Sequence, residues 1–534
     1  MDNTFLCCIL VALLTLIICI TFWQGMQATD DLAYSLNAYH VLKYDLVIQN
    51  TSHQVGRIAT YLPLAFVFWL FGINNLSLCL IPVLSTVITS VLLFLLGKKL
   101  FDTYVGLVAG FLYAIFPLTL RYGNIFIPEP MLGAELCAAA LLFLHPVPNS
   151  RSFFNDKKLA SGLLAGLAYL TTEVGAIIIP TFLIYNFISR KASRKDWSFV
   201  TGFLVIFFME MAFFNIVYGN PFYRFTGLGM GYINDPMLHS SNQHLLYRLF
   251  KAYPRLFIFP NGGLGFFGLL LIVAGIYAIF KVRNKGYLFL LIWAGAIFGF
   301  YNFMSVRLDK YVVLPVALRL IYPGCLPLLI LGSKFLTDLW KWIKERAYMG
   351  RIVLQVFFAI SVIWLFITSI LIGYFNLNIS FTSILARNAE AAASFFKNES
   401  SVIVVSDNRT LQAISFYREF SGSDSLIEFK QSTQLQCNPG KLREKEYVVI
   451  NGLVYNISEG QSGFFPYDYL RYNIMDEALR SDRDIKFRFK YKKGSLYHRL
   501  MSLGICRKLL GEYGCKLAEI YISGKNASGW IIIL

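Results

Sequence analysis

Residues 76–96 read LSLCLIPVLSTVITSVLLFLL, a stretch with no charged side chain that is followed at once by Gly97, Lys98 and Lys99. An α-helix rises about 1.5 Å per residue, so about 20 apolar residues cross the hydrocarbon core of a bilayer. A helix also satisfies its own backbone hydrogen bonds, which no lipid can do. This stretch therefore predicts a transmembrane helix that ends at two lysines.

The rest of the first 375 residues repeats this pattern. The 534-residue chain is 56% hydrophobic, 16% aromatic and 15% charged, which is too apolar for a soluble protein of this length. We predict a polytopic α-helical membrane protein with about 11 transmembrane helices in residues 1–375. The predicted spans are residues 5–23, 76–96, 104–120, 131–146, 159–170, 174–188, 199–217, 264–280, 287–304, 321–332 and 352–375.

Lysine and arginine are unevenly distributed among the loops. Threading the chain through these spans places five basic loops on one side, at residues 98–99, 151–158, 190–195, 281–285 and 341–351. The positive-inside rule assigns that side to the cytoplasm. The same rule explains the net charge of +17 without a nucleic-acid partner. We therefore expect a multi-pass protein of the cell membrane whose other loops, and everything after residue 375, lie outside the cytoplasm.

Two regions fall outside the predicted spans. Residues 58–71 are apolar but short and contain Pro63, so we expect a helix lying on the outer membrane surface, within an external loop at residues 24–75. Residues 376–534 regain charge and have short apolar runs. Strands at 402–406 and 447–454, with helices at 384–396 and 410–418, predict an extracytoplasmic α/β domain.

Cysteine and histidine give little sign of a cofactor site. Six of the nine cysteines lie in or beside apolar segments, where a thiol usually packs as a small hydrophobe. Cys506 and Cys515 could form a disulfide outside the cytoplasm, although Cys437 leaves an odd number in that region. No spacing resembles a zinc site.

Acidic side chains stand at two helix mouths on the predicted external face. Asp30 and Asp31 follow the first span, and Glu129 lies between Pro128 and Pro130, which restricts it to a loop or a helix start. Carboxylates beside hydrocarbon are costly unless they are paired, hydrated or functional. Partial burial would bring such a group into the pKa range of a general base. The alternatives are that the aspartates cap the following helix and that Glu129 is a solvated loop acid.

A few basic residues on the same face run against the positive-inside trend. An anionic phosphate at the outer leaflet would account for them, because a guanidinium can grip two phosphate oxygens at once. For any single one, contact with lipid headgroups is the simpler explanation. These residues are Arg57, Arg121, Arg224, Arg248, Lys251, Arg255, Arg307, Lys310 and Arg319.

The order of these features resembles a known family. Asp30-Asp31-Leu-Ala-Tyr is followed by Trp69-Leu-Phe-Gly-Ile-Asn-Asn, a span, Gly97-Lys-Lys, and the segment from Arg121 to Glu129-Pro130. This order is similar to the dolichyl-phosphate-mannose protein mannosyltransferase and aminoarabinose (lipid A) transferase group of membrane glycosyltransferases, which have the GT-C fold. The likeness is best over about the first 220 residues and ends at Tyr218-Gly-Asn-Pro-Phe.

The resemblance implies roles for particular residues. Asp30 takes the position of the catalytic base, with Asp31 as its neighbour and Glu129 as a second acid. Relatives often have Asp-Glu at the first site and Asp at the second. They also often have Lys near the turn that ends at Glu173. Arg57 and Arg319 match basic positions expected to contact the donor phosphate.

The implied reaction is transfer of a sugar from a polyprenyl-phosphate-linked donor to a hydroxyl acceptor at the non-cytoplasmic face. Asp30 would deprotonate the acceptor while Arg57, Arg121 or Arg319 stabilises the departing lipid phosphate, inverting the anomeric carbon. The donor lipid is a substrate, and the converging acids leave room for a divalent metal.

Two other functions stay open. A transporter or flippase of a lipid-linked or anionic substrate would use similar residues, but predicts inverted repeats that the sequence lacks. A whole-glycan ligase or oligosaccharyltransferase would share the fold. A receptor-like protein acting through its C-terminal domain is a more distant alternative.

Overall fold

The computed structural model describes the helical region almost completely and the C-terminal region in part. The described residues are 4–27, 29–43, 46, 48, 53–145, 156–189, 196–225, 245–258, 264–305, 314, 316–345, 348–379, 402–406, 414, 427–431, 446–451, 485–489 and 529–533. By its internal contacts the chain forms two units. One comprises residues 1–23, 37–70 and 76–374, and the other comprises residues 24–36, 71–75 and 375–534.

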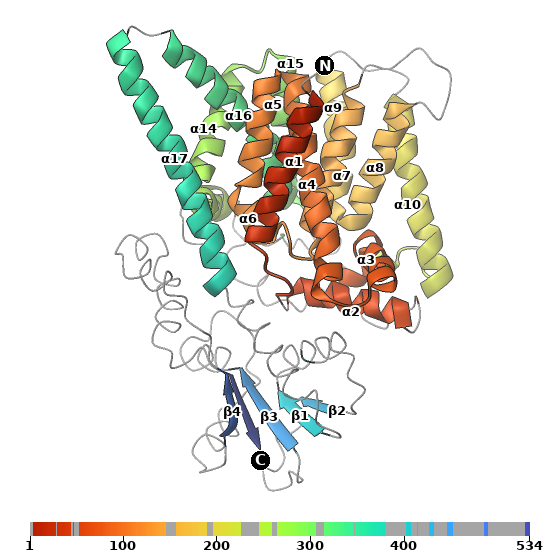
Figure 1. Cartoon of the computed structure of the whole chain (residues 1–534). Helices are drawn as coiled ribbons and strands as arrows, with labels where there is room; N and C mark the ends of the chain where they lie inside the picture. Colours follow the sequence, from red (N-terminus) through yellow and green to blue (C-terminus); the bar gives the residue numbers. More distant parts are fainter. Residues whose placement is uncertain are drawn as a thin grey trace. The chain divides into compact units, whose positions relative to one another are not determined.

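A helix stands at every predicted membrane-spanning position (Figure 1). Five of them, α1, α4, α10, α15 and the Gly350–Leu371 part of α17, are long and apolar enough to cross a bilayer. A multi-pass helical membrane protein is thus confirmed, and the full count of about 11 stays a prediction. The helices are α1 (Thr4–Thr21), α4 (Asn75–Leu100), α5 (Thr103–Ala114), α7 (Pro128–Phe143), α8 (Lys157–Thr171), α9 (Ile178–Ile188), α10 (Asp196–Tyr218), α14 (Phe266–Phe280), α15 (Lys285–Phe303), α16 (Tyr322–Lys344) and α17 (Tyr348–Ile379).

The predicted span at 104–120 was wrong in one respect, because it is broken in two. α5 ends at Ala114 and a short helix, α6 (Pro117–Tyr122), begins at Pro117. Proline has no N–H to donate to the preceding turn, so it starts a helix more readily than it continues one. The break directs the chain toward the loop that leads into α7.

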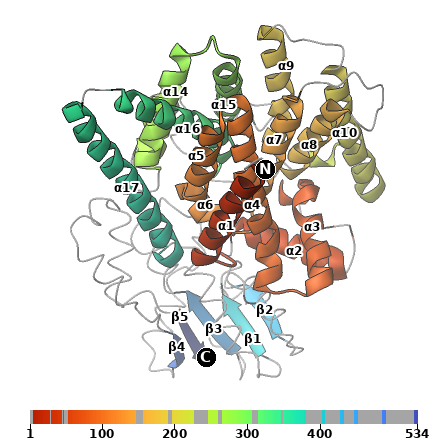
Figure 2. The same cartoon turned by 45° about the horizontal axis from the view of Figure 1, so that its top comes forward.

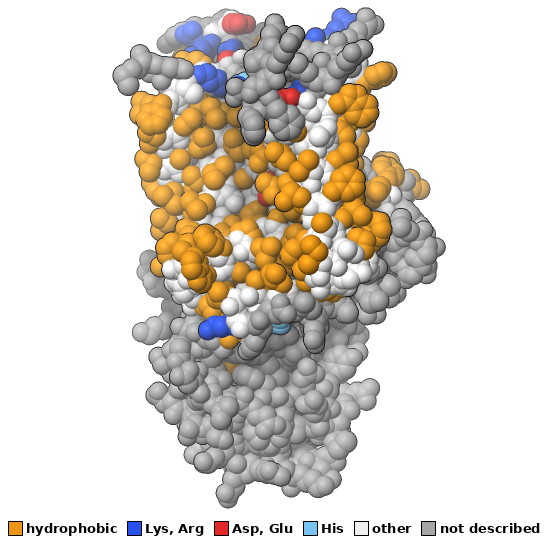
Figure 3. Space-filling view, turned by 90° about the vertical axis from the view of Figure 1, so that its right-hand side faces the viewer, with side chains coloured by type: hydrophobic (Ala, Val, Ile, Leu, Met, Phe, Trp, Pro, Cys, Tyr) orange, Lys and Arg blue, Asp and Glu red, His pale blue; other side chains and the backbone are white. Residues whose placement is uncertain are grey.

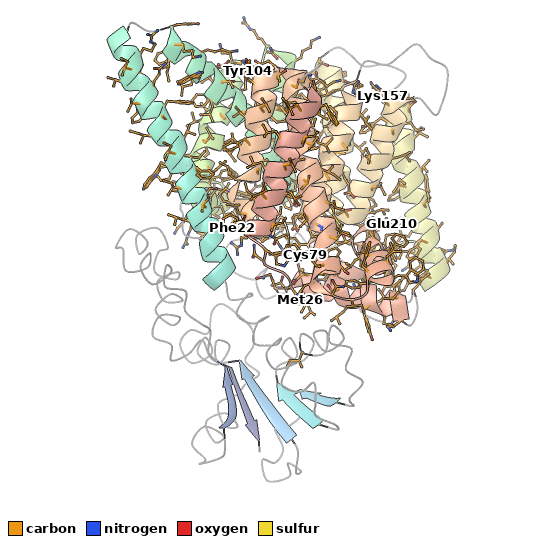
Figure 4. The ribbon with its side chains drawn as sticks, in the orientation of Figure 1. Phe22, Met26, Cys79, Tyr104, Lys157 and Glu210 are labelled. Carbon is orange, nitrogen blue, oxygen red and sulfur yellow. The ribbon has the colours of Figure 1, made fainter. Side chains whose placement is uncertain are left out.

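Described residues of the basic loops lie at one end of the helices. Lys98 of α4 donates to Thr4 of α1, and Lys341 of α16 lies 3.7 Å from Asp102, between α4 and α5. Figure 4 shows Tyr104 and Lys157 at this end and Phe22 and Cys79 at the other. On the face seen in Figure 3, Lys and Arg line one edge of a broad hydrophobic belt. This arrangement agrees with the charge pattern of the sequence.

Small residues let the helices approach closely. A Cβ on Gly97 of α4 would lie 2.8 Å from Cα of Gly106 in α5, and one on Gly202 of α10 would lie 2.4 Å from the carbonyl oxygen of Leu159 in α8. Transmembrane helices pack through such small residues because lipid provides no hydrophobic drive between them. Figure 2 shows the resulting groups, with α7, α8 and α10 together and α14, α15 and α16 together.

Helices α2 (Asp30–Lys43) and α3 (Ile58–Phe71) occupy the predicted external loop. α3 buries Tyr61, Leu64 and Phe68, whereas Phe66 and Trp69 are exposed. A helix whose outer side is also apolar suits a membrane interface. Shorter elements complete the described helical region: η1 (His53–Gly56), η3 (Glu173–Ile177), α12 (Leu245–Tyr247), the π-helical η6 (Arg248–Ala252) and α13 (Tyr253–Ile258).

The C-terminal region contains a five-stranded sheet in the order β2-β1-β3-β5-β4. The predicted strands at 402–406 and 447–454 correspond to β1 and β3. β1 is parallel to β2 and β3, and β5 is antiparallel to β3 and β4. Parallel neighbours require crossover connections, as in α/β domains. The strands are β1 (Val402–Ser406), β2 (Ile427–Gln431), β3 (Glu446–Asn451), β4 (Ile485–Phe489) and β5 (Gly529–Ile533).

Several predictions for this region lie outside the described residues. They are the helix at 384–396, the helix at 410–418 except for Ile414, and the cysteines at 437, 506 and 515. The α/β assignment of residues 376–534 therefore stays a prediction.

Candidate active site

Glu129 and Arg319 come together at the end of the bundle opposite the basic loops. Pro128 opens α7 and Glu129 follows it in the first turn, one of the two positions that the flanking prolines allow. The Glu129 side chain is buried, and its Oε1 lies 4.0 Å from Nε of Arg319. The positive end of the α7 dipole further favours a carboxylate here. Glu129 and Arg319 thus form an ion pair in which the arginine is partly exposed.

The position of Arg319 depends on how α16 begins. Tyr322, at the first position of α16, is fully buried and shares a hydrogen bond with Tyr113 of α5. A Cβ on Gly133 of α7 would lie 3.3 Å from the Tyr322 ring, so α7 and α16 pack closely at this level. These contacts hold the start of α16 beside α7 and set Arg319 next to Glu129.

The Asp30-Asp31 pair divides into two different environments. Asp31 is completely buried, and its carboxylate accepts hydrogen bonds from the backbone N–H of Gln27 at 2.5 Å and of Thr29 at 2.6 Å. The hydroxyl of Thr29 donates a third bond at 2.9 Å. Burial raises the pKa of the Asp31 carboxyl, and these hydrogen bonds oppose the rise. Asp31 thus holds the turn before α2.

Asp30, at the first position of α2, is half-buried and keeps contact with solvent. Of the two aspartates, Asp30 is therefore the better candidate for a base that meets an acceptor. Asp30 and Asp31 belong to one structural unit and Glu129 to the other. That the two predicted carboxylate sites serve one reaction stays a prediction.

The remaining arginines predicted to bind phosphate are Arg57 and Arg121. Arg57 is buried and donates through Nη2 to Oε2 of Glu173 at 2.9 Å and through Nε to Oε1 at 3.4 Å. Arg121, near the end of α6, is half-buried and lies over the ring of Tyr122 with its Cζ 5.1 Å from the centroid.

A buried ion network extends from Arg57 to Glu173, Arg224 and Glu210. Arg224 is among the external basic residues predicted from the sequence, and Glu173 marks a departure from relatives, but Glu210 was not singled out. Glu173 lies 3.1 Å from Nη2 of Arg224, and Nη1 of Arg224 lies 2.6 Å from Glu210. Arg224 is 1% exposed and lies over the ring of Tyr169. Glu210 is labelled in Figure 4. The signal was present, since an acid inside the apolar run of α10 is costly and so marks a partner or a function.

The described residues do not form a metal centre. Among them no three His, Cys, Asp or Glu side chains come together in a way that could hold an ion. The charged neighbour of Glu129 is an arginine, whose guanidinium is a poor companion for a cation. The predicted room for a divalent metal stays a prediction.

A buried acid paired with an arginine at one end of an apolar helical bundle is a candidate functional site. Two solved structures share this fold. They are the apo oligosaccharyltransferase of Archaeoglobus fulgidus, with a TM-score of 0.55, 13% identity and coverage of 84% of this chain and 70% of that one, and apo ArnT of Cupriavidus metallidurans, with a TM-score of 0.50, 14% identity and coverage of 85% and 94%. At such identities the likeness shows a common fold.

The family comparison is more specific. Residues 58–213 match the model of the dolichyl-phosphate-mannose-protein mannosyltransferase family. A curated relative, undecaprenyl phosphate-alpha-4-amino-4-deoxy-L-arabinose arabinosyl transferase 2 of Sodalis glossinidius (strain morsitans), is 25% identical over 130 residues. That match spans about a quarter of each chain (24%). The resemblance to the GT-C membrane glycosyltransferases is confirmed.

Proposed function

We propose that the protein is a glycosyltransferase that moves a sugar from a polyprenyl-phosphate-linked donor to a hydroxyl acceptor at the non-cytoplasmic membrane face. The family match at residues 58–213 carries this proposal, because it contains Arg121, Glu129, Glu173 and Glu210. The relative from Sodalis is itself named as a transferase that uses an undecaprenyl phosphate sugar.

The pair formed by Glu129 and Arg319 supports a phosphate-handling role. Its 4.0 Å separation is that of an ion pair with room for adjustment, and the Arg319 side chain is 36% exposed. An arginine aimed at a leaving phosphate lowers the barrier by stabilising the charge that develops there. Glu129 orients that arginine. Arg57 and Arg121 are further candidates for contacts with the same phosphate.

The proposed reaction is a single displacement. Asp30 takes the proton from the acceptor hydroxyl, whose oxygen attacks the anomeric carbon of the donor. The bond from that carbon to the phosphate oxygen breaks, and the electron pair leaves with the polyprenyl phosphate. Arg319 stabilises this product as it forms. Because attack occurs opposite the leaving group, the anomeric configuration is inverted.

The test is transfer by the purified chain in lipid nanodiscs, with polyprenyl-phosphate sugars as donors and mass spectrometry of all products. Comparing lipid-linked sugars and surface glycans of cells with and without the protein identifies the natural pair. Consumption of the donor together with a glycosylated acceptor supports the proposal. Movement of intact donor across vesicles without consumption would replace it with transport, and addition of a whole preassembled glycan would replace it with a ligase.

A further inference from the structure

The carboxylate of Glu173 bridges two guanidinium groups that are held very differently. Arg224 contacts Glu173 through Nη2 at 3.1 Å and Glu210 through Nη1 at 2.6 Å. Arg57 contacts Glu173 through Nε and Nη2, which is the edge by which a guanidinium grips a carboxylate or a phosphate. The four side chains carry two positive and two negative charges, so the network is neutral.

Arg224 is the fixed member of the network. Its Nη2 also donates to the backbone oxygen of Tyr169 at 2.7 Å, and its Cζ lies 4.3 Å from the centroid of the Tyr169 ring. A Cβ on Gly56 would lie 2.9 Å from Cγ of Arg224, so the backbone beside Arg57 packs on its stem. Separating Glu173 from Arg224 weakens a largely buried ion pair and is costly, whereas Arg57 would only exchange one anion for another.

Glu173 is the member most accessible to solvent. Its side chain is 22% exposed, against 10% for Arg57, 3% for Glu210 and 1% for Arg224. It lies at the turn between α8 and α9, where η3 begins, and Thr172 caps that turn. Its carboxylate can therefore give up Arg57 and keep Arg224 without leaving the turn. Glu173 thus has two arrangements, one paired with both arginines and one paired with Arg224 alone. An anion bound to Arg57 would favour the second arrangement.

We propose that Glu173 occupies the place of the donor phosphate at Arg57 and competes with it. This inference rests on the proposed function. When a polyprenyl phosphate binds, its oxygens replace the Glu173 carboxylate on the Arg57 fork, and Glu173 remains paired with Arg224. Glu173 thereby lowers the affinity of the site for phosphate and determines which phosphate it prefers.

The competition discriminates between donor and product. A sugar phosphodiester carries one negative charge, whereas a phosphate monoester has a second pKa near about 6 and carries close to two at pH 7. A carboxylate held beside the site repels the product more than the donor. Glu173 thus favours release of the polyprenyl phosphate after transfer.

The experiment measures binding of farnesyl phosphate to the full chain in nanodiscs, with farnesol and inorganic phosphate as reference ligands. Glu173→Gln keeps the size of the side chain and an oxygen that can accept from Arg57, but removes the charge. We expect it to bind farnesyl phosphate about tenfold more tightly than the wild type, and a farnesyl phosphodiester with a smaller gain. Glu210→Gln removes the same charge from the side of Arg224 and should show no such gain.

The two possible failures are distinguishable. If the wild type and Glu173→Gln both bind farnesyl phosphate no better than farnesol, the proposed function fails. If both bind it with equal affinity, or Glu210→Gln gains as much as Glu173→Gln, the competition is overturned. A structure of the unaltered chain with farnesyl phosphate gives a check that needs no variant. Phosphate on Arg57 with Glu173 kept by Arg224 supports the inference, and a bound phosphate beside an intact Arg57–Glu173 pair refutes it.

Discussion

Nε of Arg319, just before α16, lies 4.0 Å from Oε1 of Glu129 in the first turn of α7. The first turn of α7 and the turn that leads into α16 thus contribute one carboxylate and one guanidinium to the same end of the bundle. The pair gives the proposed transfer a cation that is already oriented before the donor arrives, which lowers the cost of reorganisation.

Replacement of Arg319 by Met should reduce turnover strongly while the protein remains folded. The Arg319 side chain is partly exposed, so we expect the fold to tolerate its replacement. Loss of one charge-stabilising donor typically costs about 10²–10³-fold in kcat. Steady-state kinetics with a polyprenyl-phosphate sugar measure the effect, and Arg319→Lys should recover part of it. Unchanged kcat in Arg319→Met would remove this residue from the mechanism.

Replacement of Asp30 by Asn should abolish transfer and leave the fold intact. Asparagine keeps the size and the hydrogen-bonding capacity of the side chain but cannot accept the proton of an acceptor hydroxyl. Product formation followed by mass spectrometry, beside thermal unfolding in detergent, separates chemistry from folding. Full activity of this variant would exclude Asp30 as the base.

The matched change at Asp31 should lower the stability of the protein without a separate effect on its chemistry. Its two oxygens accept three hydrogen bonds from Gln27 and Thr29 in a fully buried setting. In Asp31→Asn an NH₂ group faces a backbone N–H, and a mispaired buried group costs about 1–3 kcal/mol. We expect a lower unfolding midpoint, with activity reduced only as far as folding is. Normal stability with no activity would instead give Asp31 a direct chemical role.

The pair formed by Arg224 and Glu210 tests the buried network. Arg224→Met leaves Glu210 without its cation and Glu173 with Arg57 alone, and breaking a buried ion pair costs about 3–5 kcal/mol. The double variant Arg224→Met with Glu210→Met removes the stranded charge of Glu210, so it should be more stable than Arg224→Met alone. Unfolding in detergent of the wild type, both single variants and the double variant gives the coupling. Strictly additive effects would show that the two side chains act independently.

The positions of the helices were predictable because their signal is local. A run of about 20 apolar residues spans a bilayer wherever it occurs, and the basic loops orient it. The helix at residues 58–71 and the strand at 402–406 were predicted with the observed bounds for the same reason. The break between α5 and α6 was missed, although Pro117 marks it. The short helices α12, η6 and α13 and the strands β2, β4 and β5 were also not predicted.

The candidate site was predictable as a list of residues but not as a set of partners. Nothing local in the sequence indicates that Arg57 faces Glu173, or that Arg319 faces Glu129 from another helix. Asp30 and Asp31 look alike in sequence, and only packing distinguishes the buried one from the half-exposed one. Such pairings depend on tertiary contacts between distant segments, which a single sequence does not display.

The glycine contacts between α8 and α10 have a mechanical consequence. At Gly162 and Gly202 the backbones touch so closely that neither helix has space to slide or rotate past the other. We therefore expect α8 and α10 to move together, which keeps Glu210 in register with Tyr169. If the proposed lipid donor binds, the movements that admit its tail are expected at other helix contacts.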